Sequence, residues 1–259
     1  MDFLDECRDE KTESDLNERV LHPEFMVFTY GSNLRGRNGK GAALFAAQHH
    51  SAAEGVGEGQ SGSAYAIPTK DKQLHTLPFE TVTQAIERFK AHARRHDHQD
   101  FLLTRVGCGL AGFSDDQIAP LFEDAPENVI QPGRWIARRH DVLRVLVACP
   151  QEIDSDLVGS RLDKLLARRG QGAVVEIVVV GGAAAMESYC ASRTLPLVRF
   201  WPDRRDVSRT AFSDSLEYAA WYATHTVIIH TTDNPLGFRE SATRKMAARE
   251  EFPVRVLAI

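Results

Sequence analysis

Apolar residues recur along the chain with two different periods, and these periods predict its helices and strands. From Phe79 onward the apolar positions step by three and four residues, the spacing that places side chains on one face of a helix. Runs of bulky and β-branched residues predict strands at 25–30, 63–67 and 101–106. Between the first two strands, the small-residue run 41–47 predicts a helix packed closely on its neighbours.

The second half of the chain alternates strands and helices more regularly. Its predicted elements are strands 143–149, 174–180, 197–201, 226–230 and 254–258 and helices 153–169, 183–193, 211–223 and 238–250. Strands that are apolar along both faces are typical of a parallel sheet covered by helices on both sides. We therefore expect a doubly wound, Rossmann-like domain of five strands.

The 259 residues are enough for two domains. A Pro-Gly pair and a lapse of the apolar period place a linker at 136–140, between domains at 24–135 and 141–259. Residues 1–23 are polar and non-periodic, so we expect an acidic flexible tail there. The first 19 residues hold 8 acids and 3 bases, which accounts for the whole formal net charge of −5.

Composition argues against several classes of protein. No stretch approaches the roughly 18 consecutive apolar residues of a membrane span, and the N-terminus does not resemble a signal peptide, so we expect a cytoplasmic protein with no membrane partner. Acids and bases are equal in number outside the tail, and the net charge therefore does not support a nucleic-acid partner. The cysteines lack zinc spacing, so we expect neither a metal nor a cofactor. A homo-oligomer remains open.

The strongest local signal is a Gly-x-Gly-x-x-Gly motif between a predicted strand and a helix start, where Ser114 and Gln117 form a capping box. Glycines at such a place let backbone N–H groups approach a phosphate at the positive end of a helix. The alternative is a tight turn without a ligand. The candidate ligand-binding residues are Gly107, Cys108, Gly109, Leu110, Ala111, Gly112 and Phe113.

A second glycine-rich segment, 31–41, precedes the first predicted helix. It is not an ATPase phosphate loop, because Arg37 and Asn38 occupy the positions where that chemistry needs lysine and a hydroxyl residue. It either provides a second phosphate contact or is an ordinary surface loop. The residues that would make the contact are Gly39, Lys40 and Gly41.

Lys70 and Asp71 follow the end of a predicted strand and are the candidate catalytic residues. If the protein hydrolyses its ligand, Asp71 would position water and Lys70 would stabilise charge. Cys108 is either a nucleophile activated by a helix N-terminus or a small residue that the loop accommodates, and the lack of a nearby histidine favours the second. His92 and His96 either hold a metal or lie on a solvated helix end, and the second is again favoured.

The two glycine-rich segments, together with 64–71, resemble a phage and bacterial family of uncharacterised proteins with a macrodomain-like arrangement. The resemblance covers about residues 25–135. It implies that Asn33 approaches the distal ribose of ADP-ribose, that 107–112 wraps the diphosphate, and that Phe113 lies beside the ribose.

The second half is similar to the SLOG superfamily of Rossmann-like nucleotide-binding domains, in particular to its YpsA-like members. There a glycine pair follows the second strand and a phosphate loop follows the fourth. The Pro-Gly-Gly-x-Gly-Thr motif of the phosphoribohydrolase members is missing, so the resemblance does not imply base-releasing chemistry. The ligand-binding residues that it implies are Gly181, Gly182, Ala183, Thr231 and Thr232.

The sequence therefore predicts an α/β protein in which a macrodomain-like module is followed by a five-stranded doubly wound domain. We expect it to bind a small molecule derived from ADP-ribose or NAD. If it is an enzyme, we expect a hydrolase that acts on ADP-ribosyl or nucleotide bonds. Two alternatives stay open: a non-catalytic nucleotide sensor or sequestering protein, and an interaction scaffold with degenerate pockets.

Overall fold

The chain forms two compact units. The computed structural model describes residues 17–139, 141–150, 153–169, 172–202, 209–230, 238–249 and 254–258. The first unit is His22–Arg138, and the second joins Arg139–Ile259 to the strand β1 (Glu18–Leu21), so the boundary at Arg138 falls within the expected linker segment. In the part of the chain that the structure describes, no helix is both long and apolar enough to cross a bilayer.

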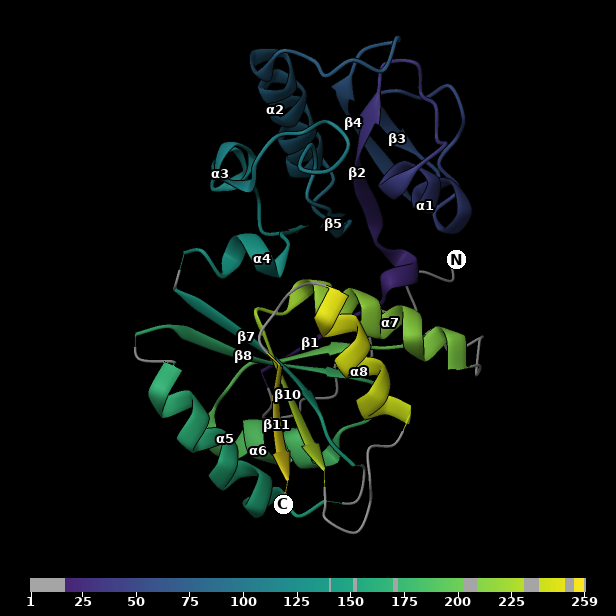
Figure 1. Ribbon diagram of the computed structural model, residues 1–259. Coiled ribbons are helices and arrows are strands. Elements are labelled where there is room, and N and C mark those ends of the chain that lie inside the picture. Colours follow the sequence, from purple (N-terminus) through teal and green to yellow (C-terminus); the bar gives the residue numbers. More distant parts are fainter. Residues whose placement is uncertain are drawn as a thin grey trace. The chain divides into compact units, whose positions relative to one another are not determined.

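The first unit is a mixed five-stranded sheet with helices packed on it (Figure 1). Its strands are β2 (Val27–Asn33), β3 (Gly59–Ser61), β4 (Ala64–Lys70), β5 (Phe101–Leu103) and β6 (Val129–Ile130), and its helices are α1 (Gly41–His49), α2 (Phe79–Arg95), α3 (Asp115–Ile118) and α4 (Gly133–Ile136). The order across the sheet is β3-β4-β2-β5-β6. Only β3 runs antiparallel to its neighbour, so β2 at the centre is parallel to both β4 and β5.

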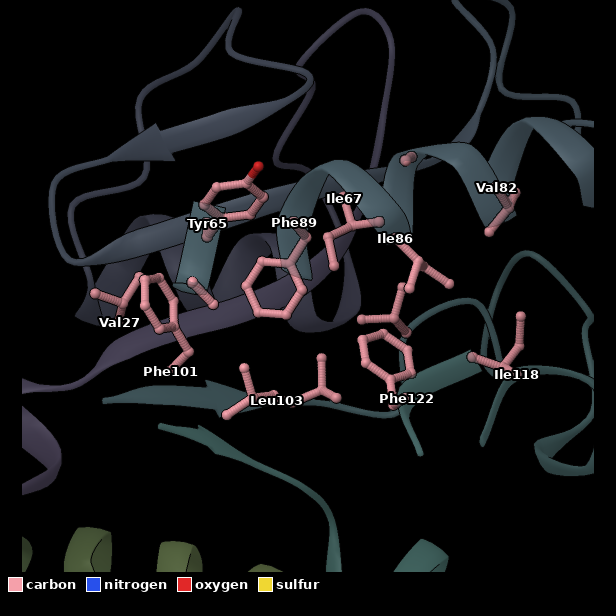
Figure 2. Close-up of a cluster of buried hydrophobic side chains, with 14 of the residues drawn as sticks. Val27, Tyr65, Ile67, Val82, Ile86, Phe89, Phe101, Leu103, Ile118 and Phe122 are labelled. Carbon is pink, nitrogen blue, oxygen red and sulfur yellow. The ribbon is translucent and has the colours of Figure 1, made fainter. Parts of the chain in front are cut away.

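The helix predicted from Phe79 is confirmed as α2, and it covers one face of this sheet. Val82, Ile86 and Phe89, spaced by four and three residues, are fully buried. Figure 2 shows them packed toward strand residues that include Ile67 and Leu103. Burial of each such side chain contributes about 1.5 to 3 kcal/mol to folding, so this layer is the core of the unit.

The small-residue helix predicted near 41–47 is also present, as α1. Ala43 and Ala46 are buried on it, and the ring of His50, just past its end, stacks on Phe28 with centroids 4.8 Å apart. Burial lowers the pKa of His50 to about 4, so the ring is neutral near pH 7.

The second unit is a parallel six-stranded sheet covered on both faces (Figure 1). Beside β1, its strands are β7 (Val142–Ala148), β8 (Val174–Val180), β9 (Leu197–Phe200), β10 (His225–His230) and β11 (Val254–Ala258), and its helices are α5 (Ser155–Arg169), α6 (Ala184–Arg193), α7 (Arg209–Tyr222) and α8 (Phe238–Arg249). The order β1-β9-β8-β7-β10-β11 gives its last five strands the arrangement 3-2-1-4-5, which is that of a doubly wound sheet. Helices α5 and α6 pack together on one face, and α7 and α8 pack together on the other.

Strand β1 lies where we expected the acidic tail, and it makes the sheet six-stranded instead of five-stranded. It pairs in parallel with β9 along its whole length. Arg199 of β9 is 5% exposed, and its guanidinium binds carboxylates of Glu18 and Glu187 and the carbonyl oxygen of Gly181. A buried guanidinium needs such partners, so Glu18 belongs to the folded second unit.

We expect Leu21→Ala to lower the free energy of unfolding of the second unit by about 3 kcal/mol, because this side chain is 1% exposed. Val20→Ala is the matched control: Val20 is 47% exposed, and its loss should change stability by less than about 0.5 kcal/mol. Urea unfolding followed by circular dichroism measures both. Equally small effects would show that β1 is not an integral strand.

Candidate functional site

Three loops of the first unit meet at the carboxyl edge of its sheet. Because β2, β4 and β5 run parallel, the segments that follow them leave from the same edge. The N–H of Leu34 donates to the carbonyl of Lys70 at 2.9 Å, and Thr76 Oγ1 donates to the carbonyl of Ala111 at 2.8 Å. We call the joined segments the carboxyl-edge surface; they are 34–41, 70–78 and 104–114.

The loop after β5 requires glycine at a close approach to the sheet. At Gly107 φ is +77°, and an added Cβ would lie 3.1 Å from the ring of Phe113. At Gly31, inside β2, an added Cβ would lie 3.2 Å from the backbone nitrogen of Gly107. A side chain at either position would push the loop away from the strand.

Three consecutive backbone N–H groups in this loop are left without an acceptor. The N–H groups on either side of them donate to carbonyl oxygens of the loop, whereas those of Gly109, Leu110 and Ala111 donate to no described group. A Cβ added at Gly109 would meet nothing within 4 Å, and Leu110 is 69% exposed. Successive N–H groups of this kind form a concavity that binds anions.

The first turn of α1 lies beside the Leu110 side chain of this loop. Lys40, at the N-cap, makes no side-chain hydrogen bond to the helix, so the side chain leaves the first N–H groups of α1 uncapped. A Cβ added at Gly41 would lie 3.9 Å from Leu110 Cδ1. The positive end of a helix and a run of unbonded N–H groups therefore share one surface, which favours an anionic ligand.

The far end of the loop is held by a buried carboxylate. Asp115, at the start of α3, accepts two hydrogen bonds from Arg105, at 2.9 and 2.7 Å, and one from Trp135 Nε1 at 2.7 Å. Burial alone would raise the pKa of Asp115, but the hydrogen bonds from Arg105 and Trp135 lower it to about 2. The capping box predicted at Ser114 and Gln117 is confirmed at the same helix start.

Cys108 lies in this loop as a half-buried thiol. Its Sγ is 3.6 Å from the carbonyl oxygen of Val106. Burial and the neighbouring charge of Asp115 raise the pKa of Cys108 to about 12. A nucleophilic cysteine needs a low pKa, so the structure favours the interpretation of Cys108 as a residue that the loop accommodates.

Asn33 is the last residue of β2, and its side chain forms hydrogen bonds with the turn that follows. Its Nδ2 donates to the carbonyl of Arg37 at 2.8 Å, and its Oδ1 accepts the N–H of Arg37 at 3.1 Å. Asn38 also makes hydrogen bonds that hold its turn: its Nδ2 donates to the carbonyl of Ala53, and its backbone N–H donates to Glu54. A ribose contact from Asn33 would require its pair with Arg37 to open.

Asp71 also stabilises a turn. Its Oδ1 accepts the N–H groups of Gln73 and His75, each at 2.8 Å, and its Oδ2 lies 3.3 Å from the His75 ring. Slight desolvation opposes the charged form, but the N–H groups of His75 and Gln73 lower the pKa of Asp71. A carboxylate with this environment is a weak base, whereas Lys70 beside it forms no ion pair with a described residue.

The hollow at the corresponding edge of the second unit is small. Gly181, with φ +68°, and Gly182 and Ala183 follow β8 as expected. The hollow lined by Gly182, Ala183 and Cys149 holds about 30 Å³, whereas small-molecule sites usually hold at least about 300 Å³. Thr231 and Thr232 lie outside the described residues.

The histidines at the end of α2 have protein partners. His92 Nε2 lies 3.0 Å from Gln60 Oε1, and His96 Nδ1 lies 2.8 Å from the carbonyl oxygen of His92. Among the described residues, no three His, Cys, Asp or Glu side chains gather in a way that could hold a metal.

We expect Asp115→Asn to destabilise the first unit by about 3 kcal/mol near pH 7, because it removes the charge of a carboxylate that is 5% exposed and accepts two hydrogen bonds from Arg105. The folded-state pKa of about 2 is below the unfolded value of about 3.9, so the carboxylate contributes fully above about pH 4 and its contribution is lost as the pH falls toward 2. The gap between wild type and variant should therefore close in acid, as measured by thermal unfolding at a series of pH values.

Asp116→Asn is the matched control, because the neighbouring Asp116 side chain is 84% exposed and its pair with Arg138 lies at the surface. It should change stability by less than about 1 kcal/mol. Equal losses in the two variants would refute the anchoring role of Asp115.

The carboxyl-edge surface brings together most of the first-unit residues that the sequence singles out, namely Lys40, Gly41, Lys70 and the loop 107–113. The Arg105, Asp115 and Trp135 anchor was not among them. Comparison with known proteins finds no matching family model, curated protein or solved structure, so the function is argued from this geometry.

Proposed function

We propose that the carboxyl-edge surface binds a nucleotide-derived small molecule through its phosphate groups, and that the ligand is related to ADP-ribose or NAD. The observation that carries this proposal is the run of N–H groups at Gly109, Leu110 and Ala111, which donate to no described group. Because they lie beside the uncapped start of α1, they form a place for a diphosphate rather than for a neutral group.

Charge and aromatic character support the same class of ligand. Lys40 and Lys70 form no ion pair with any described residue, so they are available to a phosphate. The rings of Phe79 and Phe113 lie 6.0 Å apart at the edge of the loop, and Phe79 is 40% exposed. An exposed ring can contact a ribose or stack on a base. The macrodomain-like resemblance of this half implies such a ligand as well.

Binding without catalysis fits the side chains better than hydrolysis does. The candidate nucleophile Cys108 has a raised pKa, and the candidate base Asp71 already accepts two backbone N–H groups. We therefore favour a sensor or sequestering protein over a hydrolase of ADP-ribosyl bonds. Incubation with ADP-ribose and NAD followed by chromatography tests this point, and product formed at an enzymatic rate would favour the hydrolase.

The decisive variant is Gly109→Val, measured by calorimetric titration with ADP-ribose. An added side chain at Gly109 meets nothing within 4 Å, so the fold should be unchanged while backbone approach of a phosphate is blocked. We expect affinity to fall at least about tenfold, which corresponds to about 1.4 kcal/mol. Circular dichroism and thermal unfolding check that the variant is folded.

Gly182→Val is the matched control, because a Cβ added there also meets nothing within 4 Å and the residue lies in the second unit. It should leave ADP-ribose affinity unchanged. Loss of binding in Gly182→Val alone would move the ligand to the second unit. No saturable binding of ADP-ribose or NAD by the wild-type chain would leave the interaction scaffold as the better account.

A further inference from the structure

The basic side chains of the first unit are divided between two kinds of surroundings. Several are neutralised by ion pairs; these are Arg88, Lys90, Arg94, Arg105, Arg134 and Arg138. The other basic side chains on the carboxyl-edge surface, besides Arg105, form no ion pair with a described residue. They are Arg35, Arg37, Lys40, Lys70 and Lys72. In the rest of the unit, Arg95 is the one other base without an ion pair to a described residue.

This surface therefore carries an excess of positive charge. Two acids lie at this surface beside the five unpaired basic residues: Asp71, which already accepts N–H groups of its own turn, and Glu54, which accepts the backbone N–H of Asn38. A diphosphate bridge carries about two negative charges near pH 7, which is fewer than the unpaired bases supply. The surplus points to a ligand with further phosphate groups beyond the diphosphate.

Exposed apolar side chains lie in the same three segments as these basic residues. Leu34 precedes Arg35 and is 39% exposed, Leu74 is 42% exposed, and Leu110 is 69% exposed. Leu110 lies in the loop whose N–H groups are unbonded, and the ring of Phe79 lies 6.0 Å from that of Phe113 at the end of the same loop. The nucleobases of a single strand can stack on an exposed aromatic ring such as Phe79 and pack against the neighbouring leucines, whereas the nucleobases of a duplex are already stacked on one another.

We propose that the carboxyl-edge surface binds single-stranded nucleic acid, with the nucleotide at the Gly109 loop forming part of a strand or attached to one. The inference rests on the proposed function in one respect, since it assigns the same N–H groups to a phosphate. The charge count over the whole chain did not support nucleic acid because acids elsewhere cancel these bases. Within the fold most of those acids lie outside the carboxyl-edge surface, so the charge count over the whole chain does not argue against binding of a nucleic acid there.

The test is fluorescence anisotropy of the full chain with labelled oligo(dA) and oligo(rA) of about 12 nucleotides, at roughly 50 to 200 mM salt. If the strand contacts four or five phosphates, the logarithm of the binding constant should fall with the logarithm of salt concentration with a slope of about −3. A duplex of the same length should bind at least about tenfold more weakly, because its bases cannot stack on Phe79.

Charge reversals locate the strand. Arg35→Glu and Lys72→Glu should each weaken strand binding about tenfold and make the slope shallower by about 0.7. Arg95→Glu makes the same change of charge at an equally unpaired base on the last turn of α2, the end of the helix opposite Phe79, and should have no effect. Equal effects of all three variants would mean that only the net charge matters and would overturn the proposal.

Parallel titrations separate this inference from the proposed function. Binding of ADP-ribose without binding of either strand would overturn the inference and leave the proposed function intact. Strand binding that is lost in both Arg35→Glu and Gly109→Val would support the inference, whereas strand binding unchanged in Gly109→Val would overturn it, because the strand would then not use the phosphate loop. Binding to vesicles containing phosphatidylserine but to neither strand would assign the basic residues and leucines of this surface to membrane binding and overturn the inference.

Discussion

The parallel pairing of β2 with both β4 and β5 is the constraint on which the candidate site depends. It sends three chain segments to one edge of the sheet, although the segments are separated by tens of residues in sequence. The glycine at Gly31 then lets the third segment approach the central strand. As a result, segments that carry unbonded N–H groups and unpaired basic residues leave from the same edge of the sheet.

The buried carboxylate of Asp115 holds the loop after β5 in place at this edge of the sheet. Asp115 holds Arg105 on one side of the loop and Trp135 beyond it, so the ends of the loop are held in place, and Gly109 and Leu110 between them are exposed. Donors that are held in place need no ordering when a ligand arrives, which lowers the cost of binding. The second unit has the doubly wound topology that is often associated with nucleotides, yet the hollow at the carboxyl ends of its strands β7 and β8 holds only about 30 Å³. Topology alone therefore does not make a site.

Much of the fold follows from the sequence because the apolar periods are strong. The strands at Val174–Val180 and Val254–Ala258 have the bounds that β-branched runs predict. Strand β1 was not predicted because Glu18–Leu21 has only four residues, two of them charged, and it is held by an ion pair to a residue 181 positions away. The site was also predictable only in part, because some of its contacts join residues that are not neighbours in the sequence. Glycine motifs are local, whereas the Asp115 anchor joins residues ten and twenty positions apart.

We propose that an anionic ligand binds the backbone N–H groups of the loop after β5. The most direct measurement is a nuclear magnetic resonance titration of the nitrogen-15-labelled chain with ADP-ribose, observing each amide separately. The account predicts the largest shifts at Gly109, Leu110 and Ala111 and in the first turn of α1, with Gly182 unchanged. Saturable binding that leaves the amides of Gly109, Leu110 and Ala111 unshifted would contradict it.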